Sequence, residues 1–220
     1  MLQIEFHCHT VFSKDSLVDP ERLIQTARRK RLDRLVITDH NTIKGALEAK
    51  KIDPEFVIIG EEIMTHGGEL LTAFVQEEIP PGLPAQTAIK LLREQKAFIS
   101  VSHPFDRLRS GHWELPALLE ILPFIDAIEV FNSRCMSAAF NREAKEFAEK
   151  HNLLGTVGSD AHTAFEVGRA RLLLSEFQDS GTLKIALQTA QANTKLSSPL
   201  VHFTSRYAVW YKKTIRPIQS

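Results

Sequence analysis

Short apolar segments alternate with longer amphipathic ones along most of the chain. The short segments are rich in Val, Ile and Leu, as is typical of strands that are buried on both faces. We predict strands at 2–6, 35–38, 57–60, 70–75, 98–101, 125–131 and 153–157. Apolar residues recur with helical spacing in the intervening segments. We predict helices there at 20–30, 83–95, 138–150 and 181–192.

This alternation predicts βα units and therefore an α/β fold. About seven such units in 220 residues favour a distorted, TIM-like (β/α)7 barrel, and an open doubly wound sheet is the alternative. We expect one domain over residues 1–220, because a chain of this length supports one sizeable core. The segment 197–220 is aromatic and basic, and we expect it to pack on the barrel.

Composition and charge argue against several classes of protein. Lys and Arg together number 27, as do Asp and Glu, so net charge does not attract the chain to nucleic acid or membranes. Two cysteines, Cys8 and Cys135, do not make a disulfide scaffold. The N-terminus lacks the basic and apolar regions of a signal peptide, and no segment has the length of a membrane span. We therefore expect a cytoplasmic protein.

Histidines and carboxylates follow five of the predicted strands. They are His7 and His9, then Asp39 and His40, Glu61 and Glu62, His103, and finally Asp160 and His162. Because functional residues of α/β folds gather beyond the carboxyl ends of parallel strands, we expect these side chains to meet at one rim.

The spacing of these residues is typical of metal ligation. Residues two apart on a strand point to the same side, so His7 and His9 can bind one ion, and Asp160 and His162 repeat the spacing. A mixed histidine and carboxylate set suits zinc, manganese or iron. Together with Asp15, Glu62 and Glu69 there are up to nine candidate ligands, the other six being His7, His9, His40, His103, Asp160 and His162. One ion cannot use nine ligands, so two or three ions are implied.

Each pattern alone also occurs in proteins without a metal, and the prediction depends on their conjunction. Asp39 is interpreted as a group that orients a histidine, and Cys8 as a packing residue that faces the barrel wall.

Five motifs in order resemble the PHP (polymerase and histidinol phosphatase) family over residues 4–174. They are Phe6-His7-Cys8-His9-Thr10, Ile37-Thr38-Asp39-His40-Asn41, Gly60-Glu61-Glu62-Ile63, Ser102-His103-Pro104 and Gly158-Ser159-Asp160-Ala161-His162-Thr163. The resemblance implies a distorted (β/α)7 barrel with a trinuclear metal centre. It assigns His7, His9, Glu62 and Asp160 to the first ion, Glu62, Glu69 and His103 to the second, and Asp15, His40 and His162 to the third.

Two positions depart from the family pattern. Glu69 stands where many relatives carry His, and Asp15 is followed by Ser16 where an Asp-Gly pair is common. Both changes bear on which metal the site prefers.

The resemblance implies a phosphoesterase. A hydroxide formed on the clustered ions, held by His7, His9, Glu62 and Asp160, would attack phosphorus. Basic side chains would clamp the phosphate. The candidate substrate-binding residues are Lys14, Asn132, Arg134 and Arg169. The expected partner is a small phosphate monoester: a nucleotide, a sugar phosphate or histidinol phosphate.

Two other functions stay open. An amidohydrolase also uses His-X-His after its first barrel strand, but it usually needs a carboxylated lysine or an equivalent bridge, and a longer chain. A PHP domain without catalysis would have eroded ligands, whereas this set is nearly complete. Nuclease activity is not favoured because no long basic groove is evident. The oligomeric state is left open.

Overall fold

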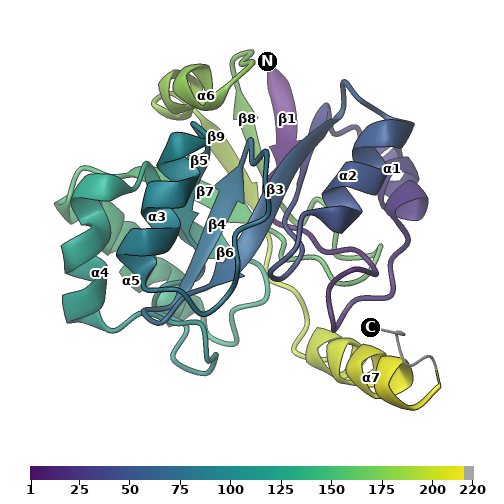
Figure 1. Ribbon diagram of the computed structural model, residues 1–220. Helices are drawn as coiled ribbons and strands as arrows, with labels where there is room; N and C mark the ends of the chain where they lie inside the picture. Colours follow the sequence, from purple (N-terminus) through teal and green to yellow (C-terminus); the bar gives the residue numbers. More distant parts are fainter. Residues whose placement is uncertain (216–220) are drawn as a thin grey trace.

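A computed structural model of the chain describes residues 1–215, and one curved mixed sheet runs through it (Figure 1). The strand order is β7-β6-β5-β4-β3-β2-β1-β8-β9. The strands are β1 (Leu2–Glu5), β2 (Arg34–Ile37), β3 (Val57–Met64), β4 (Glu69–Ala73), β5 (Phe98–Val101), β6 (Ala127–Asn132), β7 (Leu154–Gly158), β8 (Ala170–Leu174) and β9 (Gln191–Thr194).

The sheet curls until β7 approaches β1. Just beyond the two strands, Cys8 and Ala161 form a parallel bridge. The amide of His9 donates to the carbonyl oxygen of Ala161 at 2.9 Å, and the amide of Ala161 donates to that of His7 at 3.3 Å. The predicted α/β fold with a distorted, TIM-like barrel is confirmed, and the barrel is nearly closed.

The regular βα alternation breaks at β4. Every predicted strand overlaps an observed one, but β4 runs antiparallel to both β3 and β5. The tight connection after Met64, in which Gly68 has φ of 145°, is too short for a parallel crossover. The expectation of βα units throughout is therefore wrong here. Strands β8 and β9 were not predicted, and both pairs they form are antiparallel.

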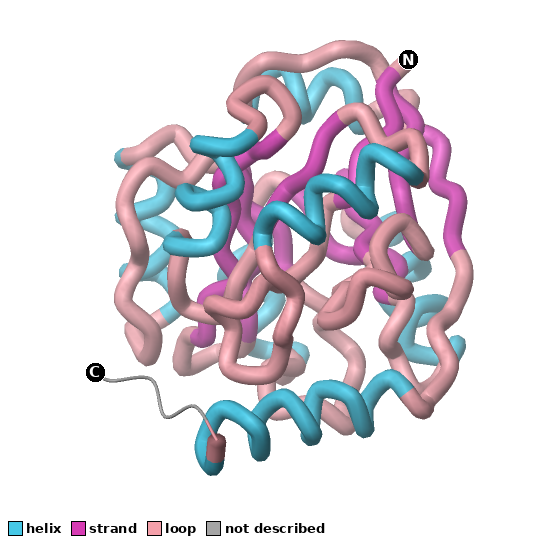
Figure 2. Tube along the Cα trace, turned by 90° about the vertical axis from the view of Figure 1, so that its right-hand side faces the viewer, coloured by secondary structure: helices cyan, strands magenta, loops and turns pink. Residues whose placement is uncertain are grey.

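Helices cover the outside of the sheet (Figure 2). They are α1 (Pro20–Arg29), α2 (Lys44–Ile52), α3 (Ala85–Glu94), α4 (Leu115–Ile121, continued by a 3-10 turn at Leu122–Phe124), α5 (Ala138–Lys150), α6 (Ser180–Leu187) and α7 (Val201–Thr214). The helix predicted at 181–192 is wrong in its second half, because residues 191–194 pair with β8 as β9. No helix in the described range is long and apolar enough to cross a membrane.

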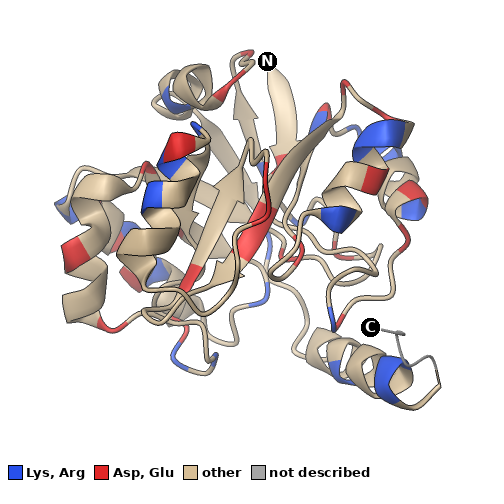
Figure 3. Cartoon of the chain, in the orientation of Figure 1, with Lys and Arg blue, Asp and Glu red and all other residues tan. Residues whose placement is uncertain are grey.

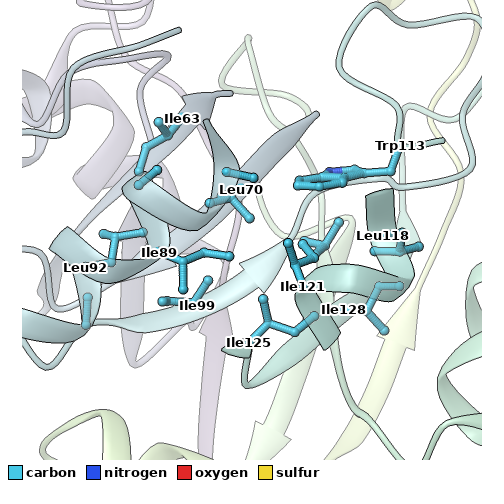
Figure 4. Close-up of a cluster of buried hydrophobic side chains, with 14 of the residues drawn as sticks. Ile63, Leu70, Ile89, Leu92, Ile99, Trp113, Leu118, Ile121, Ile125 and Ile128 are labelled. Carbon is cyan, nitrogen blue, oxygen red and sulfur yellow. The ribbon is translucent and has the colours of Figure 1, made fainter. Parts of the chain in front are cut away.

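An apolar cluster fixes the strands that carry the candidate site. Ile63, Leu70 and Ile99 from the sheet meet Leu92 of α3 and the ring of Trp113 (Figure 4). Trp113 also donates its indole N–H to the carbonyl oxygen of Glu69 at 3.0 Å. Packing of this kind holds the ends of β3, β4 and β5 in one arrangement.

The segment that ends in α7 lies beyond the other helices, near the loops at the bottom of Figure 1. Ser197 donates its amide to the carbonyl oxygen of Ser133 at 2.7 Å. Lys212 is buried and donates to the carbonyl oxygens of Val11 and Ser13. Residues 216–220 of the predicted packing segment lie outside the described residues.

Candidate metal centre

His7 and His9 extend β1 beyond its last residue, and both are fully buried. Their alternation with Cys8 places the two imidazoles on one side, with ring centroids 5.1 Å apart. Cys8 faces the other way, where its thiol donates to the carbonyl oxygen of Val36 at 3.2 Å.

Two carboxylates face these imidazoles. His7 Nε2 lies 3.3 Å from Glu62 Oε1 and 3.6 Å from Asp160 Oδ1. His9 Nε2 lies 3.4 Å from Glu62 Oε2 and 3.2 Å from Asp160 Oδ1. Glu62 lies within β3, because that strand continues past the predicted end at residue 60. Figure 3 marks acidic residues in this strand.

The converging atoms have no hydrogen-bond partners in the described structure. They are His7 Nε2, His9 Nε2, Glu62 Oε2 and Asp160 Oδ1, and all are buried. Leaving such atoms unpaired costs on the order of 1–3 kcal/mol each. A divalent cation would satisfy all four together, so this donor set fits the metal that the sequence implies.

A second group surrounds Glu62. His103 Nε2 lies 3.2 Å from Glu62 Oε1 and 3.4 Å from Glu69 Oε2. Glu62 thus stands between the first group and this one, in the place that a bridging carboxylate would take.

The third group gathers around Asp15. Asp15 Oδ2 lies 3.2 Å from His162 Nε2 and 3.6 Å from His40 Nε2. The other ring nitrogen of His40, Nδ1, lies 3.0 Å from Glu62 Oε2 and 3.8 Å from Glu69 Oε1. His40 therefore faces both the second and the third groups, whereas the resemblance assigned it to the third alone. The structure brings all nine predicted ligands together.

The backbone is unusual at two of these residues. His103 has φ of 22° and Asp160 has φ of 52°, in the region that L residues rarely adopt. Such conformations persist where the surroundings over-determine them, and they cluster at functional sites.

Burial and neighbouring charges act together on the ionisation of these groups. Burial alone would lower the pKa of His7, but the carboxylates of Glu62, Glu129 and Asp160 raise it well above its usual value. Burial likewise opposes ionisation of Asp160, yet the Arg109 guanidinium and His7 hold its pKa well below the usual range. Burial and the neighbouring rings of His162 and His40 lower the pKa of His9. Metal ligation requires neutral imidazoles and ionised carboxylates, so metal binding to this cluster would depend on pH.

Asp39 acts on His9 through Ser13. Asp39 accepts hydrogen bonds of 2.6 Å from the amide and the hydroxyl of Thr10 and from the hydroxyl of Ser13. Ser13 Oγ in turn lies 3.1 Å from His9 Nδ1. Because the Ser13 proton goes to Asp39, Nδ1 must donate, which leaves His9 Nε2 free as a ligand.

Glu129 and Arg109 were missed by sequence reasoning. Glu129, on β6, accepts from His7 Nδ1 at 2.9 Å and from the amide of His103 at 2.8 Å. Arg109 donates to Asp160 Oδ2 at 2.5 Å and to Asp106 at 3.2 Å. The charged Glu129 inside an apolar strand was a usable signal, whereas Arg109 lies in a loop whose course the sequence does not indicate.

Lys14 and Arg134 line a pocket of about 250 Å³ over the centre. Its walls include the candidate ligands Asp15, His40, Glu69 and His162, and also Arg109, His202 and Ser205. The side chains of Lys14, Arg109 and Arg134 thus place three positive charges around the pocket over the candidate ligands.

The other two predicted substrate residues lie elsewhere. Asn132 is fully buried, and its amide donates to Glu129 Oε2 at 3.0 Å and Asp160 Oδ2 at 3.2 Å, so it supports the cluster from beneath. Arg169 lines a separate pocket beside the start of α7 and donates to the carbonyl oxygen of Leu196. Arg169 therefore does not line the pocket of Lys14 and Arg134, and its predicted contact with the phosphate stays a prediction.

Two family models match the chain. The PHP domain model matches residues 5–103, and a PHP-associated model matches residues 138–183. The uncharacterized protein MJ0417 of Methanocaldococcus jannaschii is 39% identical over 178 residues, which cover 80% of this chain and 71% of that protein.

Solved structures share the fold. One is a two-domain protein from Bacteroides vulgatus that contains a predicted PHP-like metal-dependent phosphoesterase. It matches with a TM-score of 0.73 at 21% identity over 88% of this chain and 65% of its own, so the present chain spans about two thirds of it. An amidohydrolase from Chromobacterium violaceum matches with a TM-score of 0.57 at 15% identity over 72% and 87% of the two chains.

The family models and the archaeal relative cover most of the chain, and the ligand motifs fall within the matched segments. This chain belongs to the PHP family.

Proposed function

We propose that this protein is a metal-dependent phosphoesterase that hydrolyses a small phosphate monoester. One observation carries the proposal: buried, unpaired ligand atoms converge beneath a pocket whose rim is cationic. A site of this kind combines ligands for divalent ions with groups that attract a dianionic phosphate.

The residues of the candidate site have two roles: some would bind the metal ions, and others orient those ligands. The nine ligands would hold two or three ions, and their imidazole and carboxylate donors suit zinc, manganese or iron. Bound ions of this kind would activate water and neutralise charge on phosphate oxygens. Glu129 and Ser13 orient His7 and His9 from behind.

The basic residues at the rim would bind the substrate's phosphate. Arg109 is tied to Asp160 and Asp106, and Arg134 lies near Glu166, so both guanidiniums are held in place before a ligand arrives. Preorganised cations of this kind lose little side-chain freedom on binding an anion. Lys14 is exposed and adds a positive charge at the edge of the pocket.

Amide hydrolysis is the second candidate, because the fold is shared with an amidohydrolase. Two observations favour phosphate esters. Glu62 already stands between two ligand groups, where a bridging group is needed. The three cations around the pocket suit an anionic substrate better than a neutral amide.

His7→Ala tests the proposal. The variant should lose bound metal, measured by mass spectrometry after purification, and should lose phosphatase activity across a panel of esters assayed with Mn²⁺, Zn²⁺ and Fe²⁺. Its circular dichroism should stay that of a folded protein. His66→Ala, in an exposed turn, should keep both metal and activity.

Full activity in a folded, metal-free His7→Ala protein would overturn the proposal. A parallel panel of cyclic amides separates the two chemistries, because turnover of amides alone would favour the amidohydrolase.

A further inference from the structure

The last described helix contributes a wall to the candidate substrate pocket. His202 and Ser205 of α7 line the pocket together with Arg134. The helix lies outside both segments that the family models match, which end at residue 183. Its contribution is therefore a feature of this chain that the family models do not describe.

Arg134 is fixed by the helix. Its Nη2 donates to the carbonyl oxygen of Val201 and to Ser205 Oγ, each at 2.9 Å, and its Nε lies 3.2 Å from Glu166 Oε1. The position of a cation at the pocket therefore depends on the position of α7.

These contacts define which hydrogen-bonding groups of the wall are left for a ligand. His202 Nε2 lies 3.1 Å from the carbonyl oxygen of Arg134, which can only accept, so Nε2 carries the proton and Nδ1 is an acceptor. Burial and the nearby Arg134 guanidinium lower the pKa of His202, which supports the neutral ring. Ser205 Oγ accepts from Arg134, so its own proton is free to be donated.

A hydroxyl group complements this pair, because it can donate to His202 Nδ1 and accept from Ser205. The remaining wall includes Met64, the exposed Ser110 and the buried Gly111. The pocket volume of about 250 Å³ corresponds to roughly eight water molecules, which suits a compact molecule and not a polymer.

We propose that His202 and Ser205 recognise a hydroxyl group on the substrate, so that this site selects a small polyol or sugar monophosphate. The inference rests on the proposed phosphoesterase function and adds to it the class of alcohol that the ester contains. Arg134, positioned by α7, would bind the phosphate of the same molecule.

The test compares two substrates that differ only in hydroxyl groups: glycerol 3-phosphate and n-propyl phosphate. The metal-loaded wild type should favour glycerol 3-phosphate by about tenfold in kcat/KM, the scale of one or two hydrogen bonds. Ser205→Ala and His202→Phe should each reduce this preference to about threefold or less, mainly through KM. The preference is a ratio, so any loss of phosphate binding through Arg134 lowers kcat/KM for both esters alike and leaves the ratio to report the hydroxyl contact.

Two controls exclude a structural effect. Tyr207→Phe removes an exposed hydroxyl from the same helix, and His66→Phe makes the same change as His202→Phe in an exposed turn. Both should keep the wild-type preference. All variants should keep the wild-type metal content, and the two controls should also keep the wild-type inhibition constant for inorganic phosphate.

The outcomes separate the two proposals. If the wild type hydrolyses phosphate esters without favouring the hydroxylated one, or if neither variant lowers the preference, the inference about α7 is wrong. If the metal-loaded wild type hydrolyses no phosphate ester, the proposed function itself is wrong.

Discussion

Glu129 supports two candidate ligands at once. Its carboxylate receives the ring N–H of His7 and the amide of His103, and it is buried. A carboxylate behind a histidine fixes the ring orientation and makes the imidazole a better ligand. At the scale of single residues, the affinity of the candidate centre for a metal would therefore depend on groups that do not touch the metal.

Glu129→Gln should weaken metal binding while leaving the ligands in place. We expect a loss of about 10- to 100-fold in affinity for Zn²⁺ or Mn²⁺, measured by competition with a chelator. Glu143→Gln, on the exposed face of α5, should change the affinity little. An unchanged affinity in Glu129→Gln would show that Glu129 does not orient His7.

Glu61 differs from its neighbour Glu62 in having no part in the cluster. Its Oε2 accepts from the amide of Ile79 at 3.1 Å, and its Oε1 is buried without a hydrogen bond in the described structure. Burial raises the pKa of Glu61 to about 8. Sequence reasoning assigned Glu61 to the rim together with Glu62, but alternation along β3 turns the two side chains to opposite faces.

Glu61→Gln should be more stable than the wild type, and the difference in the free energy of unfolding should grow as pH rises from 5 to 8. Glu61 is protonated in both states below its ordinary pKa of 4.5. Between pH 4.5 and about 8, Glu61 ionises only in the unfolded chain, so the free energy of unfolding falls as pH rises. Above about pH 8, Glu61 ionises in both states and the loss stays constant. The variant should gain on the order of 1–3 kcal/mol at pH 8 and much less at pH 5, measured by urea unfolding.

Glu48→Gln, on an exposed face of α2, is the matched control and should show no such pH dependence. A Glu61→Gln protein that loses stability equally at both pH values would contradict the raised pKa.

At the scale of elements, apolar periodicity was enough to predict each strand from β1 to β7, because these strands are buried and short. Apolar periodicity failed for a strand made of polar residues, because such a strand shows no apolar alternation. All four residues of β9 are exposed, so residues 191–194 carry no apolar strand pattern, and the prediction ended a helix at residue 192. The antiparallel direction of β4 was missed because strand hydrophobicity does not indicate direction.

The helix α7 was also missed, although its segment was expected to contact the barrel. Its contacts with the body use polar groups, such as Arg134 with Ser205 and Lys212 with Val11. Apolar periodicity cannot reveal a helix that is attached in this way.

Lys212→Met should loosen the loop that carries Asp15. The ammonium of Lys212 joins α7 to the carbonyl oxygens of Val11 and Ser13. Its loss should lower the free energy of unfolding by about 1–3 kcal/mol and speed amide hydrogen exchange in residues 11–16. Lys213→Met, on the exposed side of the same helix, should change stability by less than about 0.5 kcal/mol. Equal exchange rates in the two variants would show that Lys212 does not hold the loop.

At the scale of the whole molecule, the candidate centre depends on closure of the barrel. His7 and Asp160 lie 153 positions apart in the sequence, yet the bridge between Cys8 and Ala161 brings them together. The convergence of most candidate ligands was predictable because they lie at or near strand ends in order along the chain, whereas Asp15 lies in a loop and Glu69 begins β4. The partition of His40 between two groups, and the roles of Arg109 and α7, depend on loop courses that only the three-dimensional structure reveals.

The most direct test is a crystal structure of the protein grown with Mn²⁺ or Zn²⁺ and measured at the absorption edge of the metal. The account predicts anomalous peaks about 2.0–2.2 Å from His7 Nε2, His9 Nε2 and carboxylate oxygens of Glu62 and Asp160. A further peak is expected between Glu62, Glu69 and His103. Anomalous peaks confined to other surfaces, with the nine side chains bound to no ion, would contradict it.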